Sequence, residues 1–556
     1  MDRGTKIFKF QFEINMNHLE YIKSSCGCNI PFSFGVKSTG KFYTPDVIAN
    51  RIFDLIFDNI TIQNKKNFSI VDPFAGDGRM ACWFINRWIK KCLPKVNWNV
   101  HLYDIEMEGL KLVSDQIENL KKCGASVSAH IHHGDSFRLL CDSYDEYDFV
   151  LTNPPWELIK PDTRELSFLD DDIKSRYITE MKSYDLFLAQ EYPLSQPKTK
   201  YAGWGTNLSR VGLELAHRIC KPNGFCGIVL PASFFADEQS QGLRDFLLID
   251  NKLIDISYYP SGAKLFSGMD FDSCSLVYEK EKSGNKCINI TIFDEKLNTT
   301  SSDSFRIKES CPIPITMGVK NLGILEKMQA ECGTWGEAEQ NGRLWAGREL
   351  DQTGIDNFLK PVGNGYLFIK GRMIGRYEIT EQPSLNVCKN GWTPPQSCDF
   401  HRIAWRDVSR PSQKRRVIAT VIPPKIIAGN SLGVAYIRKS TLEELYSLLG
   451  VMNSLCFEFQ LKNYLATGHI SLSSLRRVAI PDVGSLSRFK KLSEYVAMAL
   501  CGNKKNIDNI EAYVARNIYK LSEFEFNNII NSFTKISAEE RNSLIKAYAE
   551  ESCCDV

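Results

Sequence analysis

Residues 68–78 read Phe-Ser-Ile-Val-Asp-Pro-Phe-Ala-Gly-Asp-Gly, and this stretch decides the fold. The apolar run that ends at Asp72 is typical of a buried strand, and residues 80–89 then place apolar side chains at helical spacing. A strand, a glycine-rich turn and a helix in this order are typical of a nucleotide-binding element. Gly76 and Gly78 suit a backbone that passes close to a ligand, because glycine has no side chain.

The same pattern continues on both sides of this stretch. Residues 46–60 have helical periodicity, and later apolar runs end at Asp104, Asp135 and Asn153. Alternating helices and strands predict an α/β fold with a doubly wound parallel sheet. Because ligands of such sheets bind at the carboxyl ends of the strands, we expect these residues and Asp72 to line one site.

The run that ends at Thr152 is followed by the turn Asn153-Pro154-Pro155-Trp156. The two prolines fix the backbone and lack N–H donors, so the turn offers carbonyl acceptors beside the Asn153 side chain. The indole of Trp156 adds a flat apolar face. This combination favours a planar ring that carries an amino group, and a purine with an exocyclic amine fits it best.

The order of these motifs resembles that of gamma-class adenine-N6 DNA methyltransferases from type II (type IIS or IIG-like) restriction–modification systems. The resemblance covers about residues 40–280 and includes Lys41-Phe-Tyr-Thr-Pro45, the 72–78 turn, the strand-end acids and the Asn-Pro-Pro-Trp turn. It implies a Rossmann-like, S-adenosylmethionine-dependent methyltransferase sheet, followed by a C-terminal α+β target-recognition domain.

By this resemblance the cofactor is S-adenosyl-L-methionine. Its amino-acid end would lie between the Tyr-Thr-Pro segment and the glycine turn, and Asp104 would hold the ribose, with Glu106 as the competing candidate. Asp135 would bind the adenine amino group, and Phe137 would flank the adenine ring. The candidate cofactor residues are Tyr43, Thr44, Pro45, Asp72, Pro73, Ala75, Gly76, Gly78, Asp104, Glu106, Asp135 and Phe137.

The expected chemistry is direct methyl transfer to the N6 atom of an adenine in DNA. The side-chain oxygen of Asn153 and the carbonyl of Pro154 would accept the amino protons, and fixed dipoles and positioning would supply most of the rate. A base inside a duplex cannot reach this turn, so the enzyme would flip it out. Trp156 would stack on the base, and the family places a second aromatic where Phe266 stands.

The net charge of +2 hides a basic region in the C-terminal half. Residues 360–440 contain 14 Lys and Arg against 4 Asp and Glu, and residues 401–416 alone contain six of these cations around Trp405. Such side chains can neutralise phosphates and read base edges. The candidate DNA-binding residues are Lys370, Arg372, Arg376, Arg402, Trp405, Arg406, Arg410, Lys414, Arg415 and Arg416.

The length of 556 residues predicts two or three domains. We expect an N-terminal extension over 1–40, a catalytic domain over 41–285 with an insertion at 161–200, a linker over 286–345, a target-recognition domain over 346–485, and a helical region over 486–556. Residues 366–377 look like a basic hairpin within the recognition domain.

Several features exclude other classes of site. The 18 cysteines are scattered without a CxxC pair, which is typical of reduced core residues in a cytosol. His130 and His132 alternate with His133 along one strand, and no fourth ligand stands nearby, so we expect no metal site. No leader and no apolar run of 18 residues is found, so we expect no membrane partner. Double-stranded DNA is the expected partner of a monomeric, cytoplasmic prokaryotic protein, with a cognate endonuclease encoded separately.

Two alternatives remain open on the sequence, and two others conflict with it. One is an N-methyltransferase that acts on RNA or on protein glutamine, because those enzymes also use Asn-Pro-Pro turns. A second is a methyltransferase or specificity component of a larger restriction or phage-defence complex. A fused nuclease would need an extra domain, for which the residues before Tyr43 leave no room. A DNA-binding module without catalysis would leave the cofactor turn unexplained.

Overall fold

The computed structural model of the chain describes residues 21–23, 29–31, 43–61, 65–161, 166, 170–198, 200, 203–266, 271–281, 287–307, 313–350, 356–361, 365–388, 393–410, 413–465 and 468–551. The chain forms two compact units. The first is Met1–Phe53 with Asn59–Ile228, and the second is Asp54–Asp58 with Val229–Val556. A short antiparallel pair, β1 (Tyr21–Lys23) and β2 (Asn29–Pro31), precedes the main elements.

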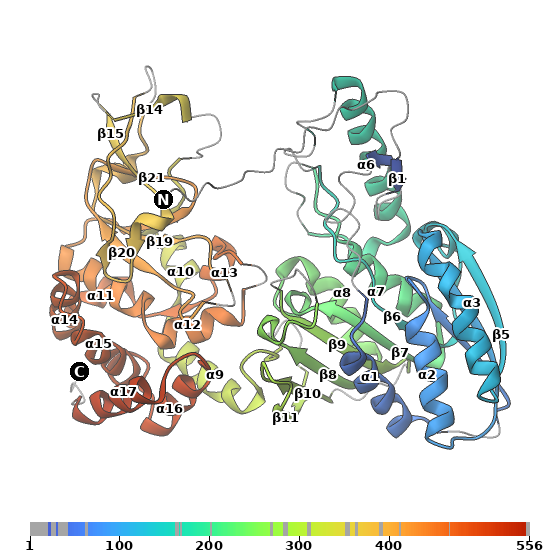
Figure 1. Ribbon diagram of the computed structural model, residues 1–556. Helices are drawn as coiled ribbons and strands as arrows, with labels where there is room; N and C mark the ends of the chain where they lie inside the picture. The colour runs from blue at the N-terminus through green and yellow to red at the C-terminus, as the bar shows by residue number, and fades with distance from the viewer. Residues whose placement is uncertain are drawn as a thin grey trace, which may run out of the picture. The chain divides into compact units, whose positions relative to one another are not determined.

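The first unit contains the predicted parallel sheet, which confirms the expected fold class (Figure 1). Neighbouring strands run in the order β7-β6-β3-β4-β5, and each pair is parallel. After β3 the chain adds β4 and β5 on one side of it and then β6 and β7 on the other side, so the strand order reverses between β3 and β6. Open α/β sheets bind their ligands at such a reversal. The strands are β3 (Asn67–Asp72), β4 (Asn97–Asp104), β5 (Ser126–His133), β6 (Tyr147–Thr152) and β7 (Cys220–Pro231).

Helices pack on this sheet because their apolar side chains recur at helical spacing. Phe68 of β3 and Phe149 of β6 meet Phe84 and Trp88 of α2 in an aromatic cluster, in which the ring centroids lie 5.0 to 6.5 Å apart. The helices of this half are α1 (Asp46–Asn59), α2 (Arg79–Lys90), α3 (Met107–Lys122), α4 (Ser136–Leu139), α6 (Asp171–Glu191) and α7 (Leu208–Ile219). Most of the predicted insertion at 161–200 is therefore the helix α6.

The second unit begins with the end of β7 and with strands in the order β11-β10-β8-β9. β8 pairs with β9 antiparallel and with β10 parallel, and β10 and β11 form an antiparallel pair. The predicted linker over 286–345 is therefore wrong, because its first residues are sheet strands with a buried face. The elements are α8 (Gln241–Asp250), β8 (Lys252–Tyr259), β9 (Ser273–Glu279), β10 (Cys287–Phe293) and β11 (Thr299–Arg306).

Two small sheets carry the basic region. One has the order β13-β22-β19-β20 and the other β14-β18-β15-β21. The predicted hairpin over 366–377 is not present, because β15 pairs with β18 and β21, whereas β16 (Ile374–Gly375) pairs with β17 (Glu378–Ile379). The other strands are β13 (Leu344–Gly347), β14 (Leu359–Lys360), β15 (Tyr366–Ile369), β18 (Asn386–Val387), β19 (Arg402–Arg406), β20 (Ala419–Ile422), β21 (Ile426–Ala428) and β22 (Leu432–Ile437).

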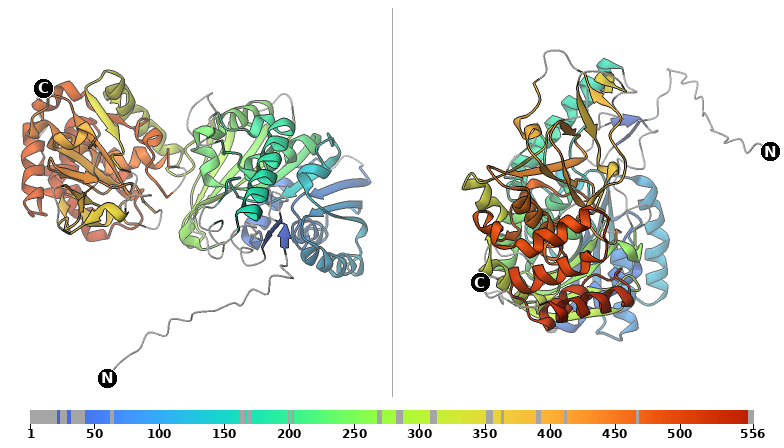
Figure 2. Two further views of the ribbon diagram at one scale, coloured as in Figure 1. Left: turned by 90° about the horizontal axis from the view of Figure 1, so that it is seen from above. Right: turned by 90° about the vertical axis from the view of Figure 1, so that its left-hand side faces the viewer.

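One hydrophobic core joins the sheet of β13, β22, β19 and β20 to the C-terminal helices. Trp335, Trp405, Phe457, Tyr513 and Tyr548 belong to a single cluster of buried side chains. Both views of Figure 2 show the red helices gathered against the orange strands. Packing therefore does not separate the predicted regions 346–485 and 486–556. The helices are α9 (Leu322–Glu331), α10 (Trp335–Gln340), α11 (Leu442–Met452), α12 (Leu455–Lys462), α13 (Leu472–Leu475), α14 (Lys490–Leu500), α15 (Asn506–Tyr513), α16 (Glu523–Asn531) and α17 (Ala538–Glu550).

Two short pieces complete the second unit. β12 (Gly333–Thr334) pairs antiparallel with β23 (Ala479–Ile480), which ties the start of α10 to the segment before α14. A π-helix, Val514–Ile518, continues α15. Among the described helices none is long and apolar enough to span a membrane.

Candidate cofactor and target-base site

The glycine turn after β3 is held by backbone contacts on two sides. Gly76 and Gly78 have φ angles of 55° and 77°, in the left-handed region that favours glycine. The Ala75 N–H donates to the carbonyl of Tyr103 at 2.8 Å, and a Cβ on Gly109 of α3 would lie 2.5 Å from the Gly76 carbonyl oxygen. The turn thus fits between β4 and α3 with no room for larger residues.

Asp104 fixes this turn to the next strand. One carboxylate oxygen accepts from the Gly76 N–H at 2.7 Å, and the other accepts from the Glu106 N–H at 2.8 Å. Both oxygens therefore hold backbone. Glu106 is the N-cap residue of α3 and is partly exposed.

The Tyr-Thr-Pro segment lies against the same turn. A Cβ on Gly76 would lie 2.8 Å from Cε1 of Tyr43, so the phenol ring covers the glycine. The Arg79 guanidinium stacks on that ring at 4.3 Å and is also paired with Asp77 at 2.7 Å. Thr44 is buried, and the Pro45 carbonyl accepts from the first turn of α1. The sequence motif before the sheet thus reaches the glycine turn.

Asp72 is a buried acid at the centre of the strand edge. Its carboxylate accepts from the Thr152 hydroxyl at 2.6 Å and from the Phe74 N–H at 3.1 Å. Burial raises the pKa of Asp72 to about 7, and the neighbouring carboxylates of Asp104 and Asp77 act in the same direction. The bond to Thr152 links the end of β3 to the end of β6.

The acid after β5 caps the short helix α4. Asp135 accepts from the Phe137 N–H at 3.0 Å, and the Ser136 hydroxyl donates to the Pro73 carbonyl. Phe137 is 1% exposed, and its ring lies 5.0 Å from Phe74 and 5.9 Å from Tyr192. The structure thus places Phe137 inside the fold beside the turn.

The Asn-Pro-Pro-Trp turn leaves β6 directly after the buried Thr152. Pro154 is buried and Asn153 and Trp156 are partly buried. Helix α7 supports the turn through Gly212, where a Cβ would lie only 2.3 Å from the Pro154 Cβ. The chain after the turn is also held, because the Leu208 N–H donates to the Glu157 carbonyl at 2.8 Å.

The first unit therefore brings together most of the candidate residues. The Tyr-Thr-Pro segment, the glycine turn, the acids after β4 and β5, and Asn153 share one edge of its sheet. Phe266 belongs to the second unit, where it is buried. Sequence reasoning missed Thr152 and Gly212, whose roles depend on contacts between distant elements. The described residues contain no group of three His, Cys, Asp or Glu side chains that could hold a metal.

Part of the candidate DNA-binding set is buried, which differs from its expected place on the surface. Arg402 is fully buried and pairs with the buried carboxylate of Glu349 at 2.7 Å. Trp405 is 1% exposed in the core, and Arg406 donates to the Ile374 carbonyl at 3.0 Å. These side chains stabilise the small sheets. The basic pattern itself could not separate an exposed cation from a buried, paired one.

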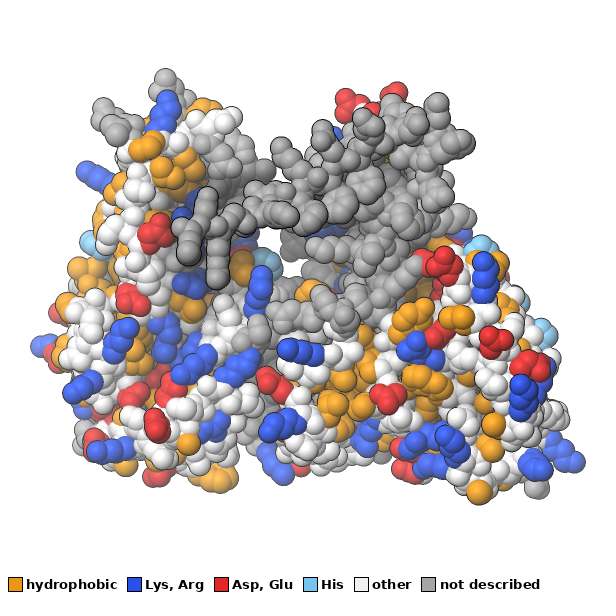
Figure 3. Space-filling model, viewed as in Figure 1, with side chains coloured by type: hydrophobic (Ala, Val, Ile, Leu, Met, Phe, Trp, Pro, Cys, Tyr) orange, Lys and Arg blue, Asp and Glu red, His pale blue; other side chains and the backbone are white. Residues whose placement is uncertain are grey.

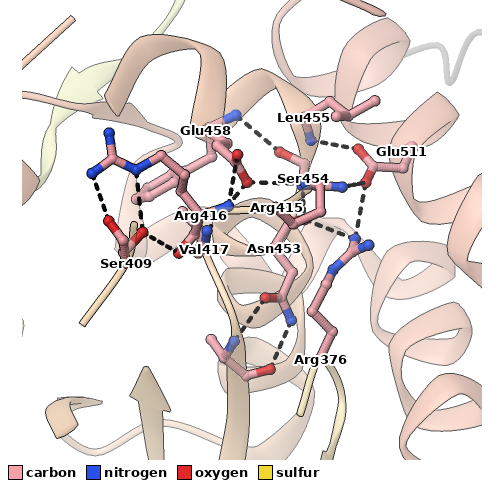
Figure 4. Close-up of polar contacts among 12 residues, drawn as sticks. Arg376, Ser409, Arg415, Arg416, Val417, Asn453, Ser454, Leu455, Glu458 and Glu511 are labelled. Carbon is pink, nitrogen blue, oxygen red and sulfur yellow. Dashed lines mark hydrogen bonds and ion pairs between the residues drawn. The ribbon is translucent and has the colours of Figure 1, made fainter. Parts of the chain in front are cut away.

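Three more arginines are bound into a polar network at the junction of α11 and α12 (Figure 4). Arg415 donates to Glu458 and to Glu511, each at 2.9 Å, and Arg376 donates to Glu511 at 3.0 Å. Arg416 is buried and donates to the carbonyl of Ser409 at 2.7 Å. The hydrogen-bond partners of these arginines thus belong to the protein itself.

The remaining candidates lie at the surface. Arg372 is paired with Glu381 at 3.5 Å while its side chain is 74% exposed, and Lys414 pairs with Glu540 at 2.6 Å. Arg410 is exposed and Lys370 is partly exposed. On the face shown in Figure 3, Lys and Arg side chains alternate with Asp and Glu. These four residues are the part of the set that can meet a ligand without rearrangement.

A parallel sheet that reverses its order beside a glycine turn, with acids at the following strand ends, is a Rossmann-like arrangement. Residues 88–266 match the family described as Eco57I restriction-modification methylase. This stretch contains α3, the strands β4 to β8 and the Asn-Pro-Pro-Trp turn, and it begins after β3 and the glycine turn.

Three solved structures are similar to this chain at low sequence identity. The type IIG restriction endonuclease BpuSI is 15% identical, with 92% of this chain and 67% of that chain covered and a TM-score of 0.37. A type I restriction-modification methyltransferase subunit from Streptococcus thermophilus is 16% identical, with 46% and 48% covered and a TM-score of 0.32. A nuclease-deletion mutant of the Type ISP enzyme LlaGI, in complex with a DNA substrate mimic, is 10% identical, with 84% and 47% covered and a TM-score of 0.47. The chain thus spans about half to two thirds of their lengths.

Proposed function

We propose that this protein is a site-specific DNA methyltransferase that uses S-adenosyl-L-methionine to methylate the N6 atom of adenine. The observation that carries this proposal is the Asn-Pro-Pro-Trp turn at the end of β6, one strand away from the glycine turn of β3, where the strand order reverses. The match of residues 88–266 to a restriction–modification methylase family supports DNA as the substrate.

The residues at the glycine turn fit the cofactor. Gly76 and Gly78 let the turn pass close to Tyr43 and to the core side chains Leu102 and Val113, and Tyr43 forms an aromatic wall beside the turn. Asp72 can become ionised next to a positively charged group, because such a group would offset the cost of its burial. Glu106 is the better candidate for the ribose hydroxyls, because both oxygens of Asp104 already accept from backbone N–H groups.

The bound cofactor would supply an electrophilic methyl group on sulfur. The side-chain oxygen of Asn153 and the carbonyl of Pro154 each accept a hydrogen bond from one N–H of the adenine amine, which directs the nitrogen lone pair out of the ring plane. Pro155 fixes the turn, and Trp156 stacks on the base. Rigid packing of Pro154 on Gly212 keeps both acceptors in place, which is how fixed dipoles lower a barrier.

The target base would have to leave the duplex to reach this turn. Lys370, Arg372, Arg410 and Lys414 are the proposed contacts to DNA, because they are at least partly exposed. The proposed biological role is to protect DNA from a cognate restriction endonuclease. Double-stranded DNA and that endonuclease are then the partners, and the protein acts as a monomer in a prokaryotic cytoplasm.

The substitution Asn153→Ala tests the proposed chemistry. We expect methyl transfer to duplex DNA to fall at least a hundredfold, because the variant lacks one of the two acceptors, while cofactor affinity measured by calorimetry changes less than threefold. Asn97→Ala is the matched control, because Asn97 bonds to Asn67 at the opposite end of β4. More than a tenth of the wild-type rate in Asn153→Ala would contradict the mechanism. Transfer to RNA or to a glutamine peptide, but not to DNA, would favour the other substrate classes.

A further inference from the structure

The second unit contains a cavity that lies outside the proposed methylation site. It is bounded on one side by the ends of β8 and β10 and on the other by α12, α16 and the segment before α17. Its volume is about 780 Å³. Pockets of about 300 to 1,000 Å³ commonly hold small organic ligands, so the cavity can admit a nucleotide or a short length of nucleic acid backbone.

A buried group of cations lies behind the wall of this cavity. Figure 4 shows Arg376, Arg415 and Arg416 around the carboxylates of Glu458 and Glu511. The Glu458 carboxylate also accepts from the N–H groups of Arg416 and Val417, at 2.8 and 3.2 Å, and Glu511 accepts from the Leu455 N–H. Backbone donors thus use much of the capacity of these two acids. With Lys462, four cations lie near these two carboxylates, and Arg416 and Lys462 line the cavity.

Lys462 is the most unusual of these side chains. Its ammonium group lies 3.4 Å from the ring centroid of Phe533. Among the described residues, no carboxylate oxygen lies within 4.0 Å of this ammonium group, the limit for an ion pair. Burial lowers the pKa of Lys462 to about 8, Glu458 opposes this shift, and Arg415 and Arg416 add to it. An anion in the cavity would offset the cost of burying the charged ammonium group, because it would stabilise the protonated form of Lys462.

Two other lysines around the cavity are paired with acids, and the carboxylate of Asp294, which also lines the cavity, accepts from the Asn298 N–H at 2.9 Å. Lys320 lies 3.5 Å from Asp303, and Lys535 lies 3.9 Å from Glu295. Asp272 also lines the cavity, and one of its oxygens accepts from the Ser261 N–H at 2.8 Å. Its charge offsets that of one of the cations.

We propose that this cavity binds a phosphate group through Lys462 and Arg416. The amide of Asn528 on α16 and the hydroxyl of Thr534 also line the cavity and are suitable uncharged donors. The phosphate belongs either to a free ligand such as a nucleotide or to the backbone of bound DNA, and both have the same charge chemistry. The proposal does not depend on the methylation mechanism, because no cavity residue belongs to the proposed cofactor or target-base site.

Pyridoxal 5′-phosphate is a direct probe of the cavity in the full-length protein. Its aldehyde condenses with a neutral lysine amine with loss of water, and borohydride reduces the resulting imine to a stable amine that peptide mass spectrometry can locate. We expect Lys462 to react at least fivefold faster than Lys546, an exposed lysine of α17 that does not line the cavity. Equal or slower labelling of Lys462 would overturn the proposal.

Protection experiments then identify the source of the phosphate. Slower labelling in the presence of inorganic phosphate or ATP supports a free ligand, and slower labelling only in the presence of duplex DNA supports the nucleic acid backbone. Labelling of Lys462 that none of these compounds slows would overturn the site. Cofactor affinity should be the same in all variants, so a failure here is distinguishable from a failure of the proposed methyltransferase.

Substitutions of Lys462 separate charge from structure. Lys462→Arg keeps a cation and should retain protection or DNA affinity, whereas Lys462→Gln should lose it, with Lys546→Gln as the matched control. In the DNA case, Lys462→Gln should reduce the slope of log affinity against log salt by about 0.9, the value of one phosphate contact. An unchanged slope, together with unchanged protection by small phosphates, would refute the role of Lys462. Circular dichroism verifies that each variant is folded.

Discussion

The contact between helix α7 and the Asn-Pro-Pro-Trp turn makes a sharp prediction about Gly212. A Cβ added to Gly212 would lie 2.3 Å from the Cβ of Pro154 and 3.2 Å from Cε2 of Phe74. Carbon atoms in contact lie about 3.5 to 4.0 Å apart, so either the helix or the turn must retreat by about 1.2 to 1.7 Å. In Gly212→Ala we therefore expect the Pro154 carbonyl and the Asn153 amide to leave their positions.

The expected effect on the reaction is much larger than the effect on stability. Misplacing reacting groups by about 1 Å can cost about a hundredfold in rate, so we expect a decrease of that order in the rate of methyl transfer. Overpacking of a core contact costs about 1 to 3 kcal/mol, partly offset by the better helix propensity of alanine. The backbone of the glycine turn is held by Tyr103 and Asp104 of β4, and only the Phe74 ring of this turn touches the added Cβ, so cofactor affinity should change less than threefold.

Single-turnover transfer of a labelled methyl group to duplex DNA measures this effect, and calorimetry measures cofactor binding. Gly242→Ala is the matched control, because Gly242 also lies in a helix and no heavy atom lies within 4 Å of an added Cβ. The control should keep its full rate. A Gly212→Ala variant with more than a third of the wild-type rate would show that the turn tolerates displacement, and the argument from rigid acceptors would be wrong.

Three further outcomes follow from buried and exposed charges. Because the pKa of Asp72 is raised to about 7 in the folded state, the native protein binds the carboxyl proton more tightly than the unfolded chain, so the free energy of unfolding should fall by up to about 1.4 kcal/mol per pH unit as the pH rises from about 4 to 7. Chemical denaturation of the cofactor-free protein at several pH values should show a flatter pH dependence in Asp72→Asn, and an equally steep one would contradict this. Arg402→Met should lower the free energy of unfolding by about 3 to 5 kcal/mol because it leaves Glu349 buried without its cation, and a loss below 1 kcal/mol would contradict the structural role. Arg372→Gln should change stability by less than about 0.5 kcal/mol but weaken DNA binding in a salt-dependent way, which filter binding at several salt concentrations can measure.

The local elements of the first unit could be predicted from the sequence because their signals are local. The apolar run before Asp72, the two glycines and the helical spacing after them lie within about 20 residues, and the structure contains β3, the turn and α2 there. The acids at the strand ends could be assigned to one edge because parallel strands share their direction. The individual roles were less accessible, since Asp104 holds backbone that comes from another strand.

The rest depends on contacts that sequence patterns do not encode. Arg402 and Arg372 look equivalent in a basic stretch, yet one is buried against Glu349 and the other is exposed. Residues 287–306 look like a polar linker because β11 exposes alternate side chains, and only the pairing with β8 and β10 reveals a sheet. Gly212 gave no local signal, because its importance arises from Pro154, 58 positions earlier.

The shared core of the second unit has a consequence for engineering new recognition specificities. Trp335 of α10, Trp405 of β19 and Tyr548 of α17 pack in one cluster, so a graft that ended near residue 485 would cut through a continuous interior. A chimera that exchanges the whole segment from Met317 to the end of α17 keeps every buried member of that cluster from one parent. The smallest piece that can be transplanted as a folded whole is therefore about 230 residues long, and natural recombination between relatives is under the same constraint.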